Sequence, residues 1–172
     1  PGGYPPFLRL KGDYDFTEAI FKKDLDYKEG YNLFDISGCT RGKGLNANTG
    51  ALIEDAQSIV SNLMTIPPAS ERGATGNLHF YNLPVTESSK RFVQLDEDMN
   101  VVRGPSDIPS EDTSIEIGIA SNAKYLRFTL VRGMSTLPTE SEIETMYGQT
   151  IITVHYRMTE YQPYHRNISE VD

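Results

Sequence analysis

The sequence contains one cysteine, Cys39, only three histidines and no tryptophan. A single cysteine cannot form a disulfide within the chain, and it cannot supply a zinc site with several thiolate ligands. None of the histidines lies in an H-x-H or H-E-x-x-H motif, and no G-x-S-x-G motif of serine hydrolases occurs. The sequence therefore predicts a protein without metal, cofactor or catalytic centre.

Basic residues are also scarce. Lys and Arg number 16 against 24 Asp and Glu, so 16 − 24 gives a net charge of −8. Nucleic acids and anionic membrane surfaces bind proteins through clustered Lys and Arg side chains, and the densest basic stretches here are Lys22-Lys23 and Lys90-Arg91. No apolar run approaches the roughly 18 residues of a membrane span. We expect neither a nucleic acid nor a membrane as a partner.

The first 30 residues differ in composition from the rest of the chain. Pro and Gly dominate residues 1–6, which predicts a linker and not a signal peptide, because no basic and apolar stretch is present. Asp15 and Glu18 are spaced as in a capping box, which favours a helix that ends at Gly30, with an extended strand as the alternative. We predict a lead-in segment over 1–30, one domain over 31–166 and a tail over 167–172.

From residue 31 onward, short apolar stretches alternate with turn residues, at intervals typical of a β-sandwich. The expected strands are Leu52-Ile53, Ile59-Val60, 63–66, 77–81, 91–95, 99–103, 114–120, 124–132 and 150–157. Thr139 and Glu142 form a capping box that begins a short helix, and Gly148 ends it. The pattern predicts an all-β fold, a jelly-roll-like antiparallel β-sandwich with one or two short helices.

The acidic turn after residue 95 resembles a calcium loop in its first residues only. Asp96 and Asp98 have the spacing of an EF-hand, but Val101 stands where the loop needs Gly and Asp107 where it needs Glu. We therefore interpret this segment as the turn of a hairpin. Loops that carry Asp96, Asp98 and Tyr147 are expected at one end of the sandwich, where they form a second candidate site.

The main candidate site is the polar side of three strands. Alternation turns Leu78, Phe80 and their counterparts inward, and if strands 77–81, 124–132 and 150–157 are neighbours, their outer face carries Tyr, His and Arg. Planar side chains that stack on sugar rings, beside groups that hydrogen-bond to hydroxyls, suit a saccharide. The predicted ligand-binding residues are His79, Tyr81, Tyr125, Arg127, His155 and Arg157. The alternative is that these residues form ordinary cross-strand pairs or lie under the N-terminal segment.

Short motifs follow one another along the chain after residue 31. They are Asn32-Leu33-Phe34-Asp35, Lys43-Gly44-Leu45-Asn46 with Asn48-Thr49-Gly50, Ser58-Ile59-Val60-Ser61 with Ile66-Pro67, Ala123-Lys124-Tyr125-Leu126-Arg127-Phe128, and Thr159-Glu160-Tyr161-Gln162-Pro163-Tyr164. In this order they resemble a carbohydrate-binding-module-like β-sandwich domain of tail proteins from phages and prophages of Gram-positive bacteria. The resemblance spans about residues 31–166.

This resemblance implies a non-catalytic module of a phage baseplate, tail fibre or tail-associated lysin that binds host cell-wall polysaccharide. It implies other baseplate or tail proteins as further partners, and a place on the virion after synthesis in the host cytoplasm. The single cysteine agrees with a reducing cytoplasm. Two alternatives remain open: a structural module that only joins baseplate subunits, and a polysaccharide depolymerase that uses a pair of carboxylates.

Overall fold

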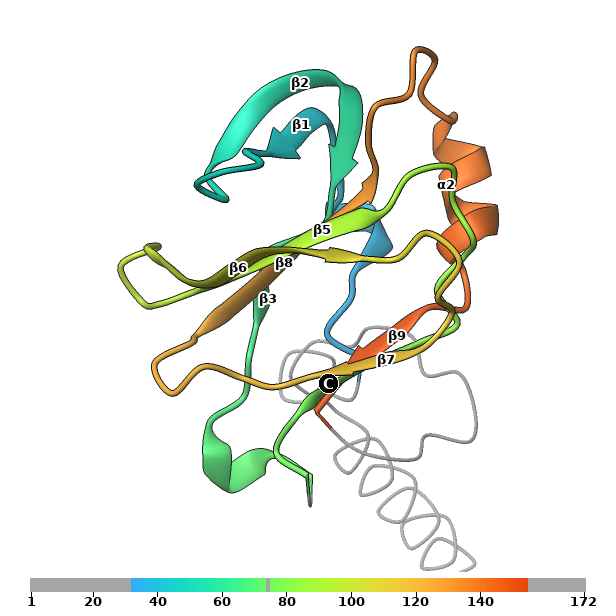
Figure 1. Cartoon of the computed structure of the whole chain (residues 1–172). Coiled ribbons are helices and arrows are strands. Elements are labelled where there is room, and N and C mark those ends of the chain that lie inside the picture. Colours follow the sequence, from blue (N-terminus) through green and yellow to red (C-terminus); the bar gives the residue numbers. More distant parts are fainter. Residues whose placement is uncertain (1–31, 74, 155–172) are drawn as a thin grey trace, which may run out of the picture. The chain divides into compact units, whose positions relative to one another are not determined.

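The structure, a computed structural model, describes residues 32–73 and 75–154 (Figure 1). The strands are β1 (Thr40–Leu45), β2 (Leu52–Val60), β3 (Met64–Thr65), β4 (Leu78–Tyr81), β5 (Lys90–Leu95), β6 (Val101–Ile108), β7 (Ile115–Ile117), β8 (Tyr125–Val131) and β9 (Ile151–Thr153). One helix, α2 (Glu140–Tyr147), and two 3-10 turns, Ile36–Gly38 and Ala69–Glu71, complete the described elements. The predicted all-β class is confirmed.

The strands form two antiparallel sheets. The larger sheet has the order β1-β2-β8-β5-β6, and β3 pairs with β8 beyond the end of β2; the smaller sheet has the order β7-β4-β9. Val60 of β2 pairs with Thr129 of β8, and Met64 of β3 pairs with Leu126. The chain therefore runs along β8 twice, with residues 61–63 as an interruption between the two pairings.

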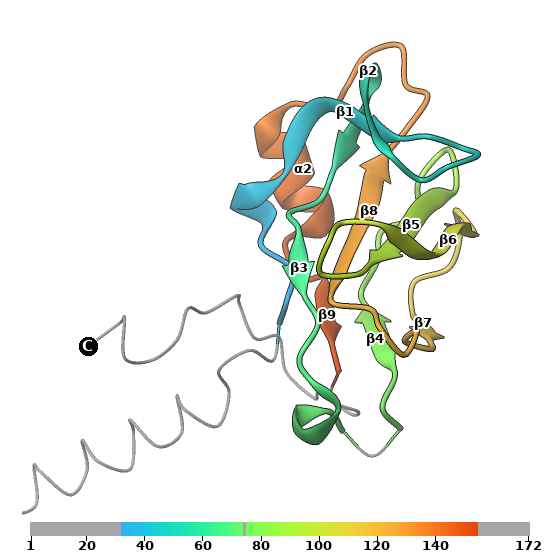
Figure 2. The same ribbon diagram turned by 90° about the vertical axis from the view of Figure 1, so that its left-hand side faces the viewer.

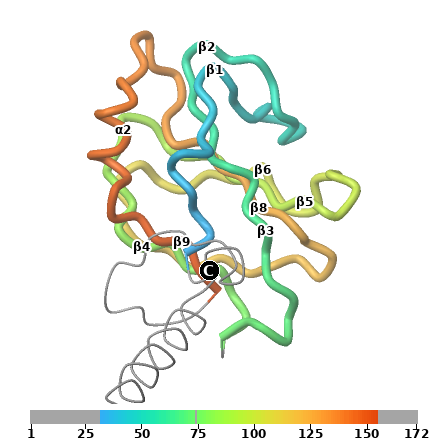
Figure 3. Tube along the Cα trace, turned by 180° about the vertical axis from the view of Figure 1, so that it is seen from behind, coloured from blue at the N-terminus to red at the C-terminus, as the bar shows by residue number. Residues whose placement is uncertain are grey.

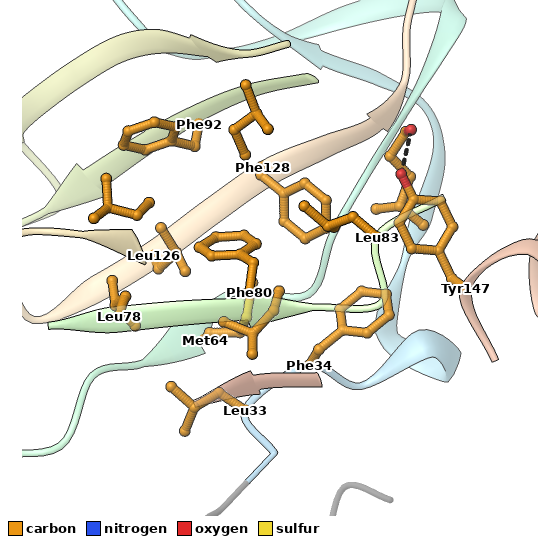
Figure 4. Close-up of a cluster of buried hydrophobic side chains, with 14 of the residues drawn as sticks. Leu33, Phe34, Met64, Leu78, Phe80, Leu83, Phe92, Leu126, Phe128 and Tyr147 are labelled. Carbon is orange, nitrogen blue, oxygen red and sulfur yellow. Dashed lines mark hydrogen bonds between the residues drawn. The ribbon is translucent and has the colours of Figure 1, made fainter. Parts of the chain in front are cut away.

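The core lies between the two sheets, where aromatic rings from both meet (Figure 4). Phe80 of β4 packs edge-on against Phe128 of β8 at 5.7 Å between ring centroids, and Phe34 contacts Phe128 at 5.8 Å. Leu126, Phe128 and Leu130 are fully buried, as the alternation of strand 124–132 predicts. The inward side of this strand was therefore predictable from its period of two.

Helix α2 begins and ends where its sequence signals place it. The Thr139 hydroxyl accepts from the backbone N–H of Glu142, and the Glu142 carboxylate accepts from the backbone N–H of Thr139. At its other end the buried Tyr147 hydroxyl donates to the Leu130 carbonyl at 2.6 Å. The predicted capping box and the stop at Gly148 are confirmed.

The hairpin of β5 and β6 turns at the acidic segment, as predicted. The Asp96 carboxylate accepts from the backbone N–H groups of Asp98 and Asn100, each at 2.9 Å. An Asp side chain that satisfies turn N–H groups stabilises the turn in place of a backbone partner. The described residues contain no group of three or more His, Cys, Asp or Glu side chains that could hold a metal ion.

Other boundaries differ from the prediction. Leu52-Ile53 and Ile59-Val60 belong to one strand, β2, because both of its ends pair with β1. The polar residues 55–58 between them lie at a register shift of this pairing. Strand β1 was not predicted, since its two glycines and two basic residues have no apolar alternation. The helix expected between Asp15 and Gly30 and the end of strand 150–157 lie outside the described residues.

Candidate functional site

The six predicted ligand-binding residues do not share one sheet. His79 and Tyr81 lie on β4 of the smaller sheet, whereas Tyr125 and Arg127 lie on β8 of the larger sheet. The expectation that these strands are neighbours is therefore wrong for β8, although β4 and β9 do pair. His155 and Arg157 lie outside the described residues. Since the outer faces of the two sheets of a sandwich point in opposite directions, the four described residues of this set cannot form a single surface.

His79 is not an accessible group in the described structure. Its side chain is only 3% exposed, its Nε2 lies 3.0 Å from the Thr75 hydroxyl, and its ring stacks on Tyr81 at 6.0 Å between centroids. Tyr81 is partly exposed. A histidine with these contacts is part of the packing of β4 and offers little surface to a sugar.

The outer face of β8 is partly covered by the hairpin of β1 and β2, which curls over it (Figure 2). Leu45 of this hairpin packs with Val60, Val93 and Leu95 in a second hydrophobic cluster, and Tyr125 packs against the cluster. A Cβ atom on Gly50 would lie 2.6 Å from the Val93 side chain, and Gly50 has a φ of 77°, so only glycine lets the hairpin loop approach this closely.

A pocket of about 200 Å³ remains open beside this cluster. It lies where residues 61–63 interrupt the pairing along β8, between that interruption and the curled hairpin. Its lining consists of Gly38, Thr40, Lys43, Leu52, Val60, Ser61, Asn62, Leu63 and Arg127. Of the predicted ligand-binding residues, Arg127 therefore contributes to a pocket, and Tyr125 lies two positions before it on the same face of β8.

Arg127 differs from the other arginines of the described residues in the surroundings of its guanidinium. Across residues 32–73 and 75–154 its guanidinium has no hydrogen bond and no ion pair, and burial lowers its pKa. The other five arginines of this part of the chain each donate to a backbone carbonyl, as Arg41 does to Pro138 and Arg103 to Gly118. A half-buried cation without an acceptor has lost part of its hydration and has no hydrogen bond to compensate for that loss. Such a group can gain free energy by binding a ligand that supplies acceptors.

Lys43 is the second cation of the pocket. Its ammonium forms an ion pair with Glu54, which is directly opposite on β2. The Lys43 side chain is 33% exposed and that of Glu54 82% exposed, so the pair contributes little to stability. An ammonium has three donors, and the ion pair leaves donors of Lys43 available to the pocket.

The remaining polar groups of the pocket fall into two kinds. Ser61 and Asn62 serve the fold: the Ser61 hydroxyl donates to the Asn62 carbonyl and accepts from the Phe128 N–H, and the Asn62 amide bonds to Leu33 and Asp35. The Thr40 hydroxyl has no hydrogen bond within the described part of the chain. Leu52 and Leu63 are exposed apolar side chains, at 44% and 38%, and form the walls.

The second candidate site is not formed. Asp96 and Asp98 lie at the turn of the β5–β6 hairpin, on the opposite side of the molecule from α2, which carries Tyr147 (Figure 3). Tyr147 is 1% exposed and its hydroxyl is bonded to Leu130. The sequence placed Tyr147 at the end of a helix correctly, but its position on the inward face removes it from any surface site.

A larger groove lies along α2. Its volume is about 550 Å³, and it is lined by Met134, Thr136, Leu137, Pro138, Ser141, Glu142, Thr145 and Met146. The groove carries one ionisable side chain, Glu142, whose carboxylate accepts from the Thr139 N–H. It therefore offers an apolar contact surface without an evident reactive group.

Sequence reasoning missed most of the pocket around Arg127. Lys43 entered only as part of a motif, and Thr40, Leu52 and Leu63 were not considered as contacts. The sequence gives little indication that these residues line a pocket. A leucine on a predicted strand is normally assigned to the core, and only the strand pairing shows that it is exposed. Only the outward position of Arg127 on its strand was readable from the sequence.

No family model matches the chain, and neither the curated proteins nor the solved structures include a match to it. The described residues form no helix that is long and apolar enough to span a membrane.

Proposed function

We propose that this chain is a non-catalytic module that binds a host cell-wall saccharide through the pocket around Arg127, as part of the adhesion device of a phage tail. The observation that carries the proposal is the chemistry of this pocket. Aliphatic walls from Leu52 and Leu63 lie beside the donors of Arg127 and Thr40, which have no acceptor among residues 32–73 and 75–154. A sugar offers C–H faces for the walls and oxygen acceptors for the donors.

The place on a phage baseplate or tail is supported by the motifs alone. They include residues that build the pocket: Lys43 belongs to the second motif, Ser61 to the third, and Arg127 to the fourth. Residues from three motifs, 18 to 84 positions apart in the sequence, thus meet at one pocket. Such convergence is expected if the motifs mark a shared site as well as a shared fold.

The affinity of one pocket is expected to be low. Sugar hydroxyls exchange hydrogen bonds with water for hydrogen bonds with protein, so the net gain is small. A pocket of about 200 Å³ is also below the usual range for an isolated small-molecule site. Many copies on one particle would compensate, because avidity raises the overall affinity by about 10²- to 10⁴-fold.

The test is a binding assay with the fluorescently labelled full chain, displayed on a multivalent carrier. We expect saturable staining of intact Gram-positive host cells, and free wall polysaccharide should compete it away. The double variant Leu52→Ser/Leu63→Ser removes both apolar walls and should reduce staining at least about tenfold. The reason is that each methylene buried against the ligand contributes roughly 0.8 kcal/mol to the binding free energy. Val85→Ser, at an exposed valine outside the pocket, is the matched control.

Two results would count against the proposal in different ways. Staining by the double variant at the wild-type level would remove the pocket as the binding site. An absence of staining over a broad host panel, even on the multivalent carrier, would remove saccharide binding itself. Release of reducing sugars from the wall would instead support the depolymerase.

The second candidate function is a structural module of the baseplate without glycan binding. The observation that favours it is the groove along α2, where Met134, Leu137 and Met146 offer flexible apolar contacts. This function predicts a stable complex with another tail protein in a pull-down, and loss of that complex in Met146→Asp. The same variant should leave glycan staining unchanged if the pocket around Arg127 is the site.

A further inference from the structure

The pocket around Arg127 offers hydrogen-bond donors and almost no free acceptors. The guanidinium of Arg127, the ammonium of Lys43 and the hydroxyl of Thr40 are its available polar groups. The acceptor atoms of Ser61 and Asn62 already accept from the Phe128 and Asp35 N–H groups. The described residues that line the pocket include no carboxylate, and Glu54, the ion-pair partner of Lys43, is not among them. A ligand that matches this arrangement has to supply acceptors, and preferably negative charge.

We propose that the pocket is an anion subsite, in which Arg127 and Lys43 bind an acidic group of the saccharide, either a carboxylate or a phosphate ester. The inference rests on the proposed function and narrows its ligand class to acidic glycans. A guanidinium presents a planar pair of donors that fits two oxygens of a carboxylate or phosphate at once. Lys43, which is also paired with Glu54, adds further N–H donors from the facing hairpin.

The surroundings of Arg127 strengthen this reading. On β5 its cross-strand neighbour is Val93, which is fully buried in the second cluster, so Arg127 begins beside apolar residues. Charge–charge attraction is stronger at a half-buried group than in bulk water, because the effective dielectric is lower. The chain as a whole has a net charge of −8, which repels an acidic glycan. Electrostatic attraction of such a glycan therefore requires a place where local cations outweigh the net negative charge.

The small volume fits one charged sugar residue better than an extended chain. At about 200 Å³ the pocket can hold a single acidic substituent with part of its ring, and the rest of a polysaccharide would lie on the surrounding surface. Recognition would then depend on one bidentate contact. Removal of that contact should be visible as a change in selectivity between acidic and neutral glycans.

The experiment titrates the full chain with three soluble probes and measures each affinity by calorimetry. The probes are an oligosaccharide with a hexuronic acid, the same oligosaccharide with its carboxyl group reduced to an alcohol, and the neutral oligosaccharide bearing a phosphate ester. We expect at least one acidic probe to bind about 10- to 100-fold more tightly than the neutral one, and the pair of acidic probes identifies the source of the charge.

Variants assign the effect to Arg127. Arg127→Gln should abolish the preference for the acidic probe, and Arg127→Lys should retain a part of it, because the charge stays and the planar fork is lost. Arg103→Gln removes one positive charge outside the pocket and is the matched control, which should keep the full preference.

The outcomes separate the two proposals. Equal binding of acidic and neutral probes, unchanged in Arg127→Gln, would overturn the anion subsite and leave saccharide binding standing. A preference for the acidic probe that persists in Arg127→Gln and falls in Arg103→Gln would also overturn it. If none of the three probes and no wall polysaccharide binds, both the subsite and the proposed function fail.

Discussion

Among single residues, Arg127 has a position that is hard to explain by folding alone. Its neighbours on β8 are the fully buried Leu126 and Phe128, and its cross-strand neighbour Val93 is fully buried as well. Its guanidinium is half-buried and lacks an acceptor in the described part of the chain. Residues kept for function commonly cost stability, because selection preserves the activity and not the free energy of unfolding.

We therefore expect Arg127→Met to leave the free energy of unfolding unchanged, or to raise it by up to about 1 kcal/mol, since the polar head that is half-desolvated would be removed. Urea unfolding followed by circular dichroism measures this change. A loss of more than about 1 kcal/mol would show that Arg127 is a structural residue and would weaken the case for a ligand.

Tyr147 gives the opposite case, in which a polar group serves the core. Its hydroxyl donates to the Leu130 carbonyl at 2.6 Å in a buried setting. Tyr147→Phe should lower the free energy of unfolding by about 1–2 kcal/mol, because that bond to the carbonyl is lost. Tyr125→Phe is the matched control: the Tyr125 hydroxyl has no hydrogen bond within the described residues, so its removal should change stability by less than about 0.5 kcal/mol. Equal losses in both variants would contradict this assignment.

At the scale of the helices and strands, the sequence predicted turns and helix ends better than it predicted which strands pair with each other. The Asp96 turn and the Thr139 capping box depend on contacts within four residues, so the sequence shows them directly. The pairing of Val60 with Thr129 joins residues far apart in the chain, and no local pattern specifies it. For this reason the outward position of Arg127 was predictable, and the separation of β4 and β8 into different sheets was not.

The capping box of α2 can be tested on its own. Thr139→Ala removes the hydroxyl that accepts from the Glu142 N–H, and we expect a loss of about 1 kcal/mol in the free energy of unfolding. Thr139→Ser keeps an oxygen at the same place and should lose only a few tenths of a kcal/mol. Thermal or urea unfolding would measure both, and a similar loss in the two variants would show that the methyl group of Thr139 matters and not its cap.

For the whole molecule, stability should fall in alkaline solution in a way that Cys39 partly controls. Burial raises the pKa of the Cys39 thiol from 9.0 to about 12, with the Asp35 carboxylate adding to the rise. Between these two values the unfolded chain has lost the thiol proton and the folded chain has kept it, so unfolding releases a proton and a rising pH favours it. The contribution of Cys39 is present in full below pH 9.0 and is lost toward about pH 12.

Cys39→Ala lacks this contribution, so the wild type should lose more stability than the variant as the pH rises. Urea unfolding of both proteins at about pH 8 and about pH 11 would measure the difference. Burial also raises the pKa of Tyr147, and the charge of the Cys39 thiolate adds to that rise, so the contribution of Tyr147 is larger in the wild type and acts in the same direction as that of Cys39. Parallel declines of the wild type and the variant would contradict the assignment to Cys39.

The pocket around Arg127 could not be predicted from the sequence, because it depends on how distant segments pack in the folded protein. The pocket combines the curled hairpin of β1 and β2, the interruption at residues 61–63 and one strand of the larger sheet. Each part is ordinary alone, and the pocket arises only where the hairpin folds over β8. The alternation of single strands places side chains on a face, and tertiary packing decides whether that face is open.

The central claim is that the pocket around Arg127 binds a saccharide, and the most direct measurement is a map of the contact in solution. Backbone amide resonances of the full chain would be followed by NMR while fragments of host wall polysaccharide are added. We expect saturable shifts concentrated at Thr40, Lys43, Leu63 and Arg127, with the residues of α2 unaffected. Shifts along the α2 groove, or no shift at any concentration of fragment, would contradict the account.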